Sequence, residues 1–161
     1  MVFDFAESFL ATLAGALRKV KLEAIVVGNV ASILNGAPVL TQDIDLLVRD
    51  TPLNRKKLRQ FAALLGGSGP SPISELTRFE RIYGAVVPVD ILYDQLAGKL
   101  KFASLRSRAV KKEVGAETLL VASLADVIKS KRAANRAKDL AALPILQATL
   151  DALGDVRRRE K

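Results

Sequence analysis

The first half of the chain carries apolar residues at two spacings, which predict helices alternating with buried strands. Apolar residues three and four positions apart, followed by basic residues, predict a helix over about Asp4–Lys19. The short apolar runs Ala24–Val27 and Ile44–Val48 are typical of buried strands. Between them we expect a short helix over Val30–Leu34. A longer helix, with basic residues on its wet side, is predicted over Pro52–Leu65.

The middle of the chain is less regular. Arg78–Tyr83 and Val86–Leu92 flank Gly84 and predict two strands of a hairpin. Gly66–Pro70 lacks the Gly-Lys-Ser/Thr ending of a phosphate-binding loop, so we interpret it as a flexible turn. Asp94–Val114 shows no clear periodicity, and we assign no element there.

The last third predicts mainly helix. Thr118–Val121 is expected to be a short strand. Ser123 begins a sequence similar to a capping box, which predicts a helix up to about Ala134. A final helical segment, Asp139–Leu153, is expected to be interrupted near Pro144.

The length and the order of these elements limit the fold class. A chain of 161 residues suits one domain, so we expect a single domain over 1–161, with a disordered basic tail at about 155–161. Helices and strands alternate without repeats, which indicates a mixed α/β or α+β class.

Composition excludes several kinds of chemistry. The chain has no cysteine and no histidine. Disulfides, thiol nucleophiles, zinc sites built on Cys or His, and Ser-His-Asp triads are therefore excluded. Any metal must bind oxygen ligands, which favours Mg²⁺ or Mn²⁺. Acid–base chemistry falls to Asp, Glu, Lys or Tyr.

The net charge of the chain indicates a polyanionic partner, and its longest uncharged stretch does not resemble a membrane-spanning helix. Lys and Arg total 25 against 17 Asp and Glu, which gives a net charge of +8. This favours a polyanion such as nucleic acid or a nucleotide, although an ordinary basic protein is the plainer alternative. The uncharged stretch Ala24–Gln42 is long enough to span a bilayer, but its asparagines, glycines and Pro38 argue against that. Asp4 and Glu7 argue against a secretory signal, so we expect a cytoplasmic protein.

The most informative segment is the predicted strand that begins with two carboxylates. Asp43 and Asp45 lie two residues apart, so they point to one face, and Ile44 and Leu46 point to the other. Their Cα atoms are separated by about 6.6 Å, and the carboxylates could bracket a pair of divalent ions. A strand end whose acids simply meet water is the alternative.

Two further segments strengthen the functional interpretation. Gly28 and Asn29 lie between a buried strand and a helix, where backbone N–H groups can receive phosphate; Asn29 could instead be a helix cap. Asp90 lies inside the apolar run Pro88–Leu92, where a carboxylate is costly unless it is paired or bound to metal.

These blocks together resemble a known superfamily. Val27–Ala31, Asn35-Gly36 and Thr41–Leu46 look like the first motif of the DNA polymerase beta-type nucleotidyltransferases, and Val89–Leu92 resembles their third carboxylate strand. Ser130–Leu140 is similar to the C-terminal helix signature of small bacterial nucleotidyltransferase-like proteins, including relatives of type IV toxin–antitoxin toxins. The resemblance implies an α+β nucleotidyltransferase fold: a short mixed β-sheet flanked by helices, with further helices at the C-terminus.

The resemblance also implies roles for single residues. According to the resemblance, Asp43 and Asp45 would hold two Mg²⁺ (or Mn²⁺) ions, and Asp90 would share one of these ions and help to deprotonate the acceptor. The resemblance also implies that the triphosphate of an NTP would be bound by Gly28, Asn29, Lys131 and Lys138.

The leading hypothesis is therefore transfer of a nucleoside monophosphate from an NTP to an unknown acceptor, such as RNA or tRNA, a protein or a small molecule. One alternative is a catalytically silent protein of this fold that binds a nucleotide or a partner in a toxin–antitoxin type system. Another is a basic nucleic-acid-binding module whose acids are structural. The sequence does not determine the oligomeric state.

Overall fold

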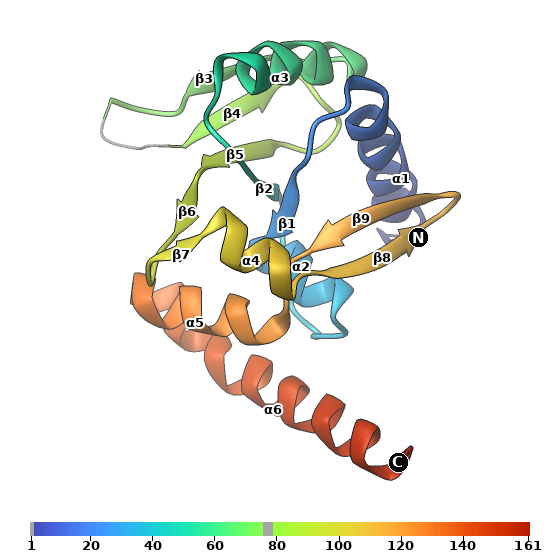
Figure 1. Ribbon diagram of the computed structural model, residues 1–161, viewed down its shortest axis with the longest axis vertical. Coiled ribbons are helices and arrows are strands. Elements are labelled where there is room, and N and C mark those ends of the chain that lie inside the picture. The colour runs from blue at the N-terminus through green and yellow to red at the C-terminus, as the bar shows by residue number, and fades with distance from the viewer. Residues whose placement is uncertain (1, 76–78) are drawn as a thin grey trace.

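The computed structural model describes residues 2–75 and 79–161, with side chains from residue 7 onward. Its main feature is a seven-stranded mixed sheet of order β3-β4-β5-β2-β1-β9-β8 (Figure 1). The strands are β1 (Ile25–Val27), β2 (Ile44–Val48), β3 (Ser68–Pro72), β4 (Glu80–Tyr83), β5 (Val89–Tyr93), β8 (Val110–Val114) and β9 (Glu117–Val121). Strands β6 (Gln95–Leu96) and β7 (Leu100–Lys101) form a separate small ribbon.

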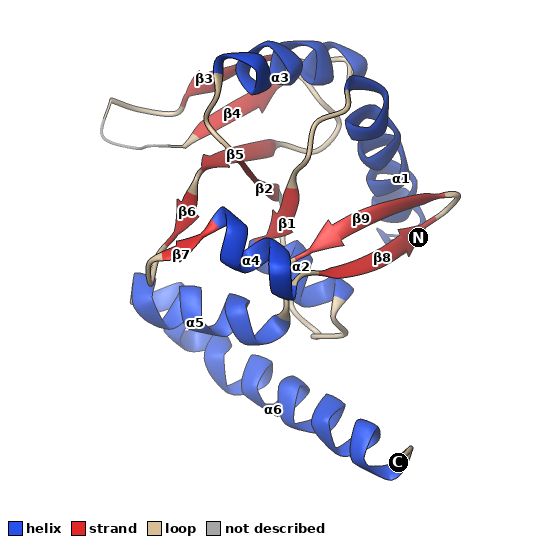
Figure 2. Cartoon of the chain, viewed as in Figure 1, coloured by secondary structure: helices blue, strands red, loops and turns tan. Residues whose placement is uncertain are grey.

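Helices lie around this sheet (Figure 2). They are α1 (Val2–Val20), α2 (Gly28–Leu34), α3 (Pro52–Leu64), α4 (Phe102–Arg108), α5 (Leu124–Ala134) and α6 (Ala137–Arg159). Helices α5 and α6 contact each other at the C-terminal end of the chain, and the last turns of α6 extend away from the sheet (Figure 1). The predicted α+β arrangement of a mixed sheet, flanking helices and C-terminal helices is confirmed.

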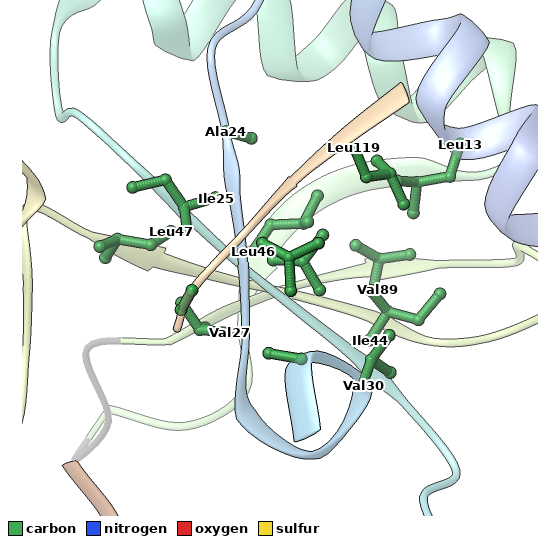
Figure 3. Close-up of a cluster of buried hydrophobic side chains, with 14 of the residues drawn as sticks. Leu13, Ala24, Ile25, Val27, Val30, Ile44, Leu46, Leu47, Val89 and Leu119 are labelled. Atoms are coloured by element: carbon green, nitrogen blue, oxygen red, sulfur yellow. The ribbon is translucent and has the colours of Figure 1, made fainter. Parts of the chain in front are cut away.

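Strand β2 lies at the centre of the sheet because it carries apolar side chains on both of its faces. It pairs antiparallel with β1 and parallel with β5. Ile44 and Leu46 share one side with Val89 of β5, and Leu13 of α1 lies on that side too, whereas Leu47 lies on the other (Figure 3). Asp45 therefore shares a side with Leu47, as does Asp43 just before the strand, at the end where the chain enters the sheet.

Local sequence signals explain where several helices begin and end. The Thr51 hydroxyl accepts a hydrogen bond from the Asn54 N–H at the start of α3, and Ser123 does the same for Asp126 at the start of α5. Helix α5 ends at Asn135, which adopts the left-handed conformation with φ of 55°. Asparagine tolerates that conformation, so the chain can turn sharply into α6.

Two sequence-based predictions about strands and loops need correction. Residues 68–72, which include part of the predicted flexible turn Gly66–Pro70, form edge strand β3 paired with β4. An edge strand can carry proline and glycine because it pairs on one side only, which is why its composition indicated a loop. The segment Asp94–Val114, which we left unassigned, contains β6, β7, α4 and β8.

The C-terminal helix also differs from the prediction. Helix α6 begins at Ala137 and continues through Pro144, where we expected an interruption. Proline removes one backbone hydrogen bond, but Leu146 in the next turn is fully buried, and that packing holds the helix together. The helix runs to Arg159, into the segment 155–161 for which we predicted disorder.

The predicted hairpin is present, as β4 and β5 pair antiparallel, although Arg78 lies outside the described residues.

Among the described residues, no helix has the length and apolarity that crossing a bilayer requires.

We expect Leu46→Ala to lower the free energy of unfolding by about 2–5 kcal/mol, because Leu46 is fully buried at the centre of the sheet. The matched control is Leu40→Ala, since Leu40 is 94% exposed and should lose almost nothing. Urea denaturation of both variants measures the difference. Equal losses would contradict the placement of β2 in the core.

Candidate active site

All seven residues singled out from the sequence line one cleft. The cleft has a volume of about 420 Å³ and lies where β1 ends and β2 and β5 begin, opposite α5 and the start of α6. Its lining includes Gly28, Asn29, Asp43, Asp45, Asp90, Lys131 and Lys138. Residues from five separate segments are thus brought together, which local sequence alone does not require.

Strand register places the three carboxylates on one wall. Asp45 lies directly opposite Asp90 in the parallel pairing of β2 with β5. Asp43, two residues before Asp45, points to the same side. The Thr41 hydroxyl donates to the backbone carbonyl of Asp43 at 2.9 Å, which helps to fix the turn that leads into the strand.

Gly28 is needed because Asp45 lies against its backbone. Gly28 has φ of +66°, and a Cβ atom built on it would lie 2.4 Å from Oδ2 of Asp45. Any other residue at position 28 would therefore combine backbone strain with a collision against a carboxylate. The close approach explains why a glycine follows β1 directly, as the first residue of α2.

The surroundings of the Asp45 carboxyl disfavour its charged form. Burial, together with the charges of Asp43 and Asp90, raises its pKa to about 7, against smaller lowering effects of Lys131 and Lys138. Asp45 is half-buried, with β1 on one side of its strand and β5 on the other. The free carboxylate would thus gain from a cation beside it.

Arg81 already supplies a cation to the other two acids. From β4, directly opposite Asp90, its Nε donates to Asp90 Oδ1 at 2.6 Å and its Nη2 donates to Asp90 Oδ2 at 2.9 Å. Nη2 also donates to Asp43 Oδ2 at 3.3 Å. The hydrogen bonds to Asp90 raise the pKa of the Arg81 guanidinium above its usual range.

The three carboxylates of the cleft match the requirements of a divalent metal ion in part. Three carboxylates on one wall are the oxygen ligands that Mg²⁺ and Mn²⁺ prefer, and the raised pKa of Asp45 indicates a place that favours positive charge. Across residues 2–75 and 79–161, however, no three acidic side chains are grouped closely enough to hold an ion. Asp43 and Asp45 fit in type and direction, whereas both oxygens of Asp90 are occupied by Arg81.

The opposite wall is basic and is organised by one buried acid. Asp139, at the start of α6, is 1% exposed and accepts hydrogen bonds from Arg136 Nε at 2.6 Å and Lys131 Nζ at 3.5 Å. Burial raises its pKa, but the hydrogen bond and charge of Arg136 and the charge of Lys131 outweigh this and keep it below its usual range. Lys138 lines the cleft and makes no ion pair with the described residues.

Asn29 and an apolar patch complete the lining. The Asn29 amide nitrogen donates to the Leu40 carbonyl at 3.4 Å, while its buried Oδ1 has no partner among the described residues. Ile73, Phe79 and Leu92 form an apolar part of the cleft beside Arg81.

Sequence reasoning missed Arg81, Arg136 and Asp139 as site residues. The sequence signal for Arg81 is the alternation within Glu80–Tyr83, which puts Arg81 on the opposite side of the strand from buried Ile82. The register that sets Arg81 opposite Asp90 has no local sequence signal. Asp139 was visible only as part of the Lys138-Asp139 pair.

Comparison with solved structures identifies the fold. A mixed sheet of this order with its flanking helices is the nucleotidyltransferase fold, because the chain superposes over nearly its whole length on structures of such proteins. No family model and no curated protein matches the sequence.

Two of the similar structures are of the antibiotic-resistance factor ANT(2'')-Ia. Its solution structure has a TM-score of 0.64 at 13% identity, covering 98% of this chain and 93% of that one. ANT(2'')-Ia in complex with adenylyl-2''-tobramycin has a TM-score of 0.65 at 15% identity, covering 98% and 99%. TM1012 of Thermotoga maritima, a candidate nucleotidyltransferase, has a TM-score of 0.53 at 19% identity, covering 94% and 86%.

We expect Gly28→Ala to destabilise the protein more than Gly36→Ala. Both glycines have positive φ, so each alanine costs roughly 1–2 kcal/mol of backbone strain, but only at position 28 does the new Cβ meet a carboxylate. Denaturant unfolding measures both losses. In an Asp45→Ala background the two losses should become similar, and an unchanged excess at position 28 would contradict the collision.

We expect Asp45→Asn to stabilise the metal-free protein at pH 8 and to have little effect at pH 4. A carboxyl whose folded pKa is about 7, above its usual 3.8, costs stability progressively as pH rises between those values. Thermal melting in chelator at both pH values measures this. Asp155→Asn, at an exposed site on α6, is the control, and an equal change in both variants would argue against the raised pKa.

Proposed function

We propose that this protein is a metal-dependent nucleotidyltransferase that transfers NMP from an NTP to a hydroxyl acceptor. The observation that carries the proposal is the convergence, in one cleft of a nucleotidyltransferase fold, of Asp43, Asp45 and Asp90 facing Lys131 and Lys138. In this reaction an acceptor oxygen bonds to the α-phosphorus, the bond to the bridging oxygen breaks, and pyrophosphate leaves.

The carboxylate wall and the basic wall of the cleft have different roles in the proposed reaction. Asp43 and Asp45 hold Mg²⁺ or Mn²⁺, which supplies Lewis-acid stabilisation of the α-phosphate and the leaving group. Asp90 accepts the proton of the acceptor hydroxyl. Gly28 and Asn29 contact the triphosphate, and Lys131 and Lys138 neutralise the charge that develops on the pyrophosphate.

The acceptor we favour is an RNA, including tRNA, with a protein hydroxyl or a small molecule as the other outcomes of the assay below. The net charge of +8 supports a polyanionic acceptor. Lys129 and Arg132 on α5 are exposed and add to the basic surface of the protein. We also propose that the protein acts in the cytoplasm.

A second candidate is a silent protein of this fold that binds a nucleotide or a partner, as in a toxin–antitoxin pair. One observation favours it: Arg81 occupies Asp90, and the described acids do not group into a ready metal site. This candidate predicts NTP binding without transfer.

We expect the wild-type protein, with Mg²⁺ or Mn²⁺ and α-labelled NTPs, to label one pool among RNA, protein and small molecules. Asp43→Asn should reduce labelling by roughly a hundredfold or more, because it removes a charge that holds the metal. Gel and thin-layer separation of the products measures the transfer.

The matched control is Asp126→Asn, which removes a buried acid away from the cleft and should retain labelling. Labelling that survives Asp43→Asn, or no labelling with any NTP while the NTP still binds, would contradict the transferase and favour the silent alternative.

A further inference from the structure

Arg81 holds two of the three acids of the carboxylate wall, Asp43 and Asp90, as a metal ion would. Its guanidinium makes a two-bond contact with Asp90 and a third contact with Asp43, and its side chain is only 29% exposed. Asp90 has an 11% exposed side chain, so it meets little water and depends on Arg81 for its neutralisation. Asp45, the third acid, has no ion-pair partner among the described residues.

This division of the three acids has a direct consequence for metal binding. The two Asp90 oxygens that a metal ion would use already accept the Arg81 hydrogen bonds. A guanidinium and a divalent ion compete for the same carboxylate oxygens, both for lone-pair directions and as neighbouring positive charges, so the presence of one weakens the binding of the other. Asp43 is less committed, because its contact with Arg81 is a single hydrogen bond at 3.3 Å.

Arg81 is also suitably placed to leave. It extends from β4, next to β5, and it lines the cleft, so its side chain can swing into the open space without disturbing the core. The neighbouring strand residue Ile82 is fully buried and keeps the backbone in register.

We propose that Arg81 is an internal counter-cation that exchanges with a divalent metal ion at Asp90. Arg81 neutralises the third carboxylate while the metal is absent, and Asp90 becomes a metal ligand only when Arg81 releases it. Arg81 is therefore a positioning residue that weakens metal binding to the free protein. This inference rests on the proposed nucleotidyltransferase site, but its test needs no turnover.

The test measures Mn²⁺ binding to the full chain without nucleotide. The electron paramagnetic resonance signal of free Mn²⁺ reports how much of the ion is bound. Arg81→Gln should bind Mn²⁺ at least about tenfold more tightly than wild type, the scale of one charge-assisted hydrogen bond. Arg81→Lys keeps the charge but cannot make the two-bond contact, so its affinity should lie between the two. Arg108→Gln is the matched control, because Arg108 pairs with buried Asp126 away from the cleft and should leave Mn²⁺ affinity unchanged.

An Asp90→Asn background separates release of Asp90 from a simple gain in negative charge. If Arg81 acts through Asp90, the effect of Arg81→Gln should shrink to below about threefold there. The same gain in both backgrounds, or no gain in Arg81→Gln, would overturn the exchange. If Arg81→Gln does not fold, as judged by circular dichroism, Arg81→Lys decides alone: tighter binding supports the exchange, and unchanged or weaker binding overturns it.

The outcome is distinguishable from failure of the proposed function. A protein that transfers no nucleotide but binds Mn²⁺ more tightly after Arg81→Gln keeps the exchange and loses the enzyme. A protein that transfers nucleotide while Arg81→Gln binds Mn²⁺ no better loses only the exchange. Absence of Mn²⁺ binding in every variant overturns the exchange.

Discussion

Repulsion among three neighbouring carboxylates is the constraint around which this cleft is arranged. Register fixes Asp45 beside Asp90, and alternation along the strand puts Asp43 on the same side. Like charges placed this close must be neutralised or protonated. The structure divides the task, since Arg81 neutralises Asp90 and Asp43 through hydrogen bonds, while Asp45 is left with a pKa of about 7. Gly28 follows from the same constraint, because only a residue without a side chain lets the Asp45 carboxylate lie against the backbone.

The basic wall depends on a second buried acid in a different part of the chain. The left-handed turn at Asn135 brings Arg136 and the start of α6 back toward α5. Asp139 then holds Lys131 from one helix and Arg136 from the segment between the helices. Removing one member of such a buried group leaves an uncompensated charge, so the cationic wall and the packing of α5 on α6 are parts of one structure.

What the sequence could predict was local, and what it could not predict was long-range pairing. The face shared by Asp43 and Asp45 follows from the two-residue period of a strand, and the start and end of α5 follow from Ser123 and Asn135. The contact of Arg81 with Asp90 depends on the register of β4 against β5, and strand β3 is specified by its neighbour rather than by its own polar residues. The continuity of α6 through Pro144 likewise depends on the burial of Leu146.

The charge of the cleft differs from that of the whole chain, and this difference bears on nucleotide binding. The chain has a net charge of +8, yet the cleft lining balances four acids, Asp43, Asp45, Asp90 and Asp139, against four bases, Arg81, Lys131, Arg136 and Lys138. A balanced cleft has little excess attraction for a triphosphate, because Arg81, Lys131 and Arg136 are each paired with an acid. Added positive charge at the carboxylate wall would change that balance and free the bases to bind phosphate. For the proposed transferase, metal and nucleotide are therefore expected to favour each other's binding, through the summed charge of the cleft rather than through any single contact.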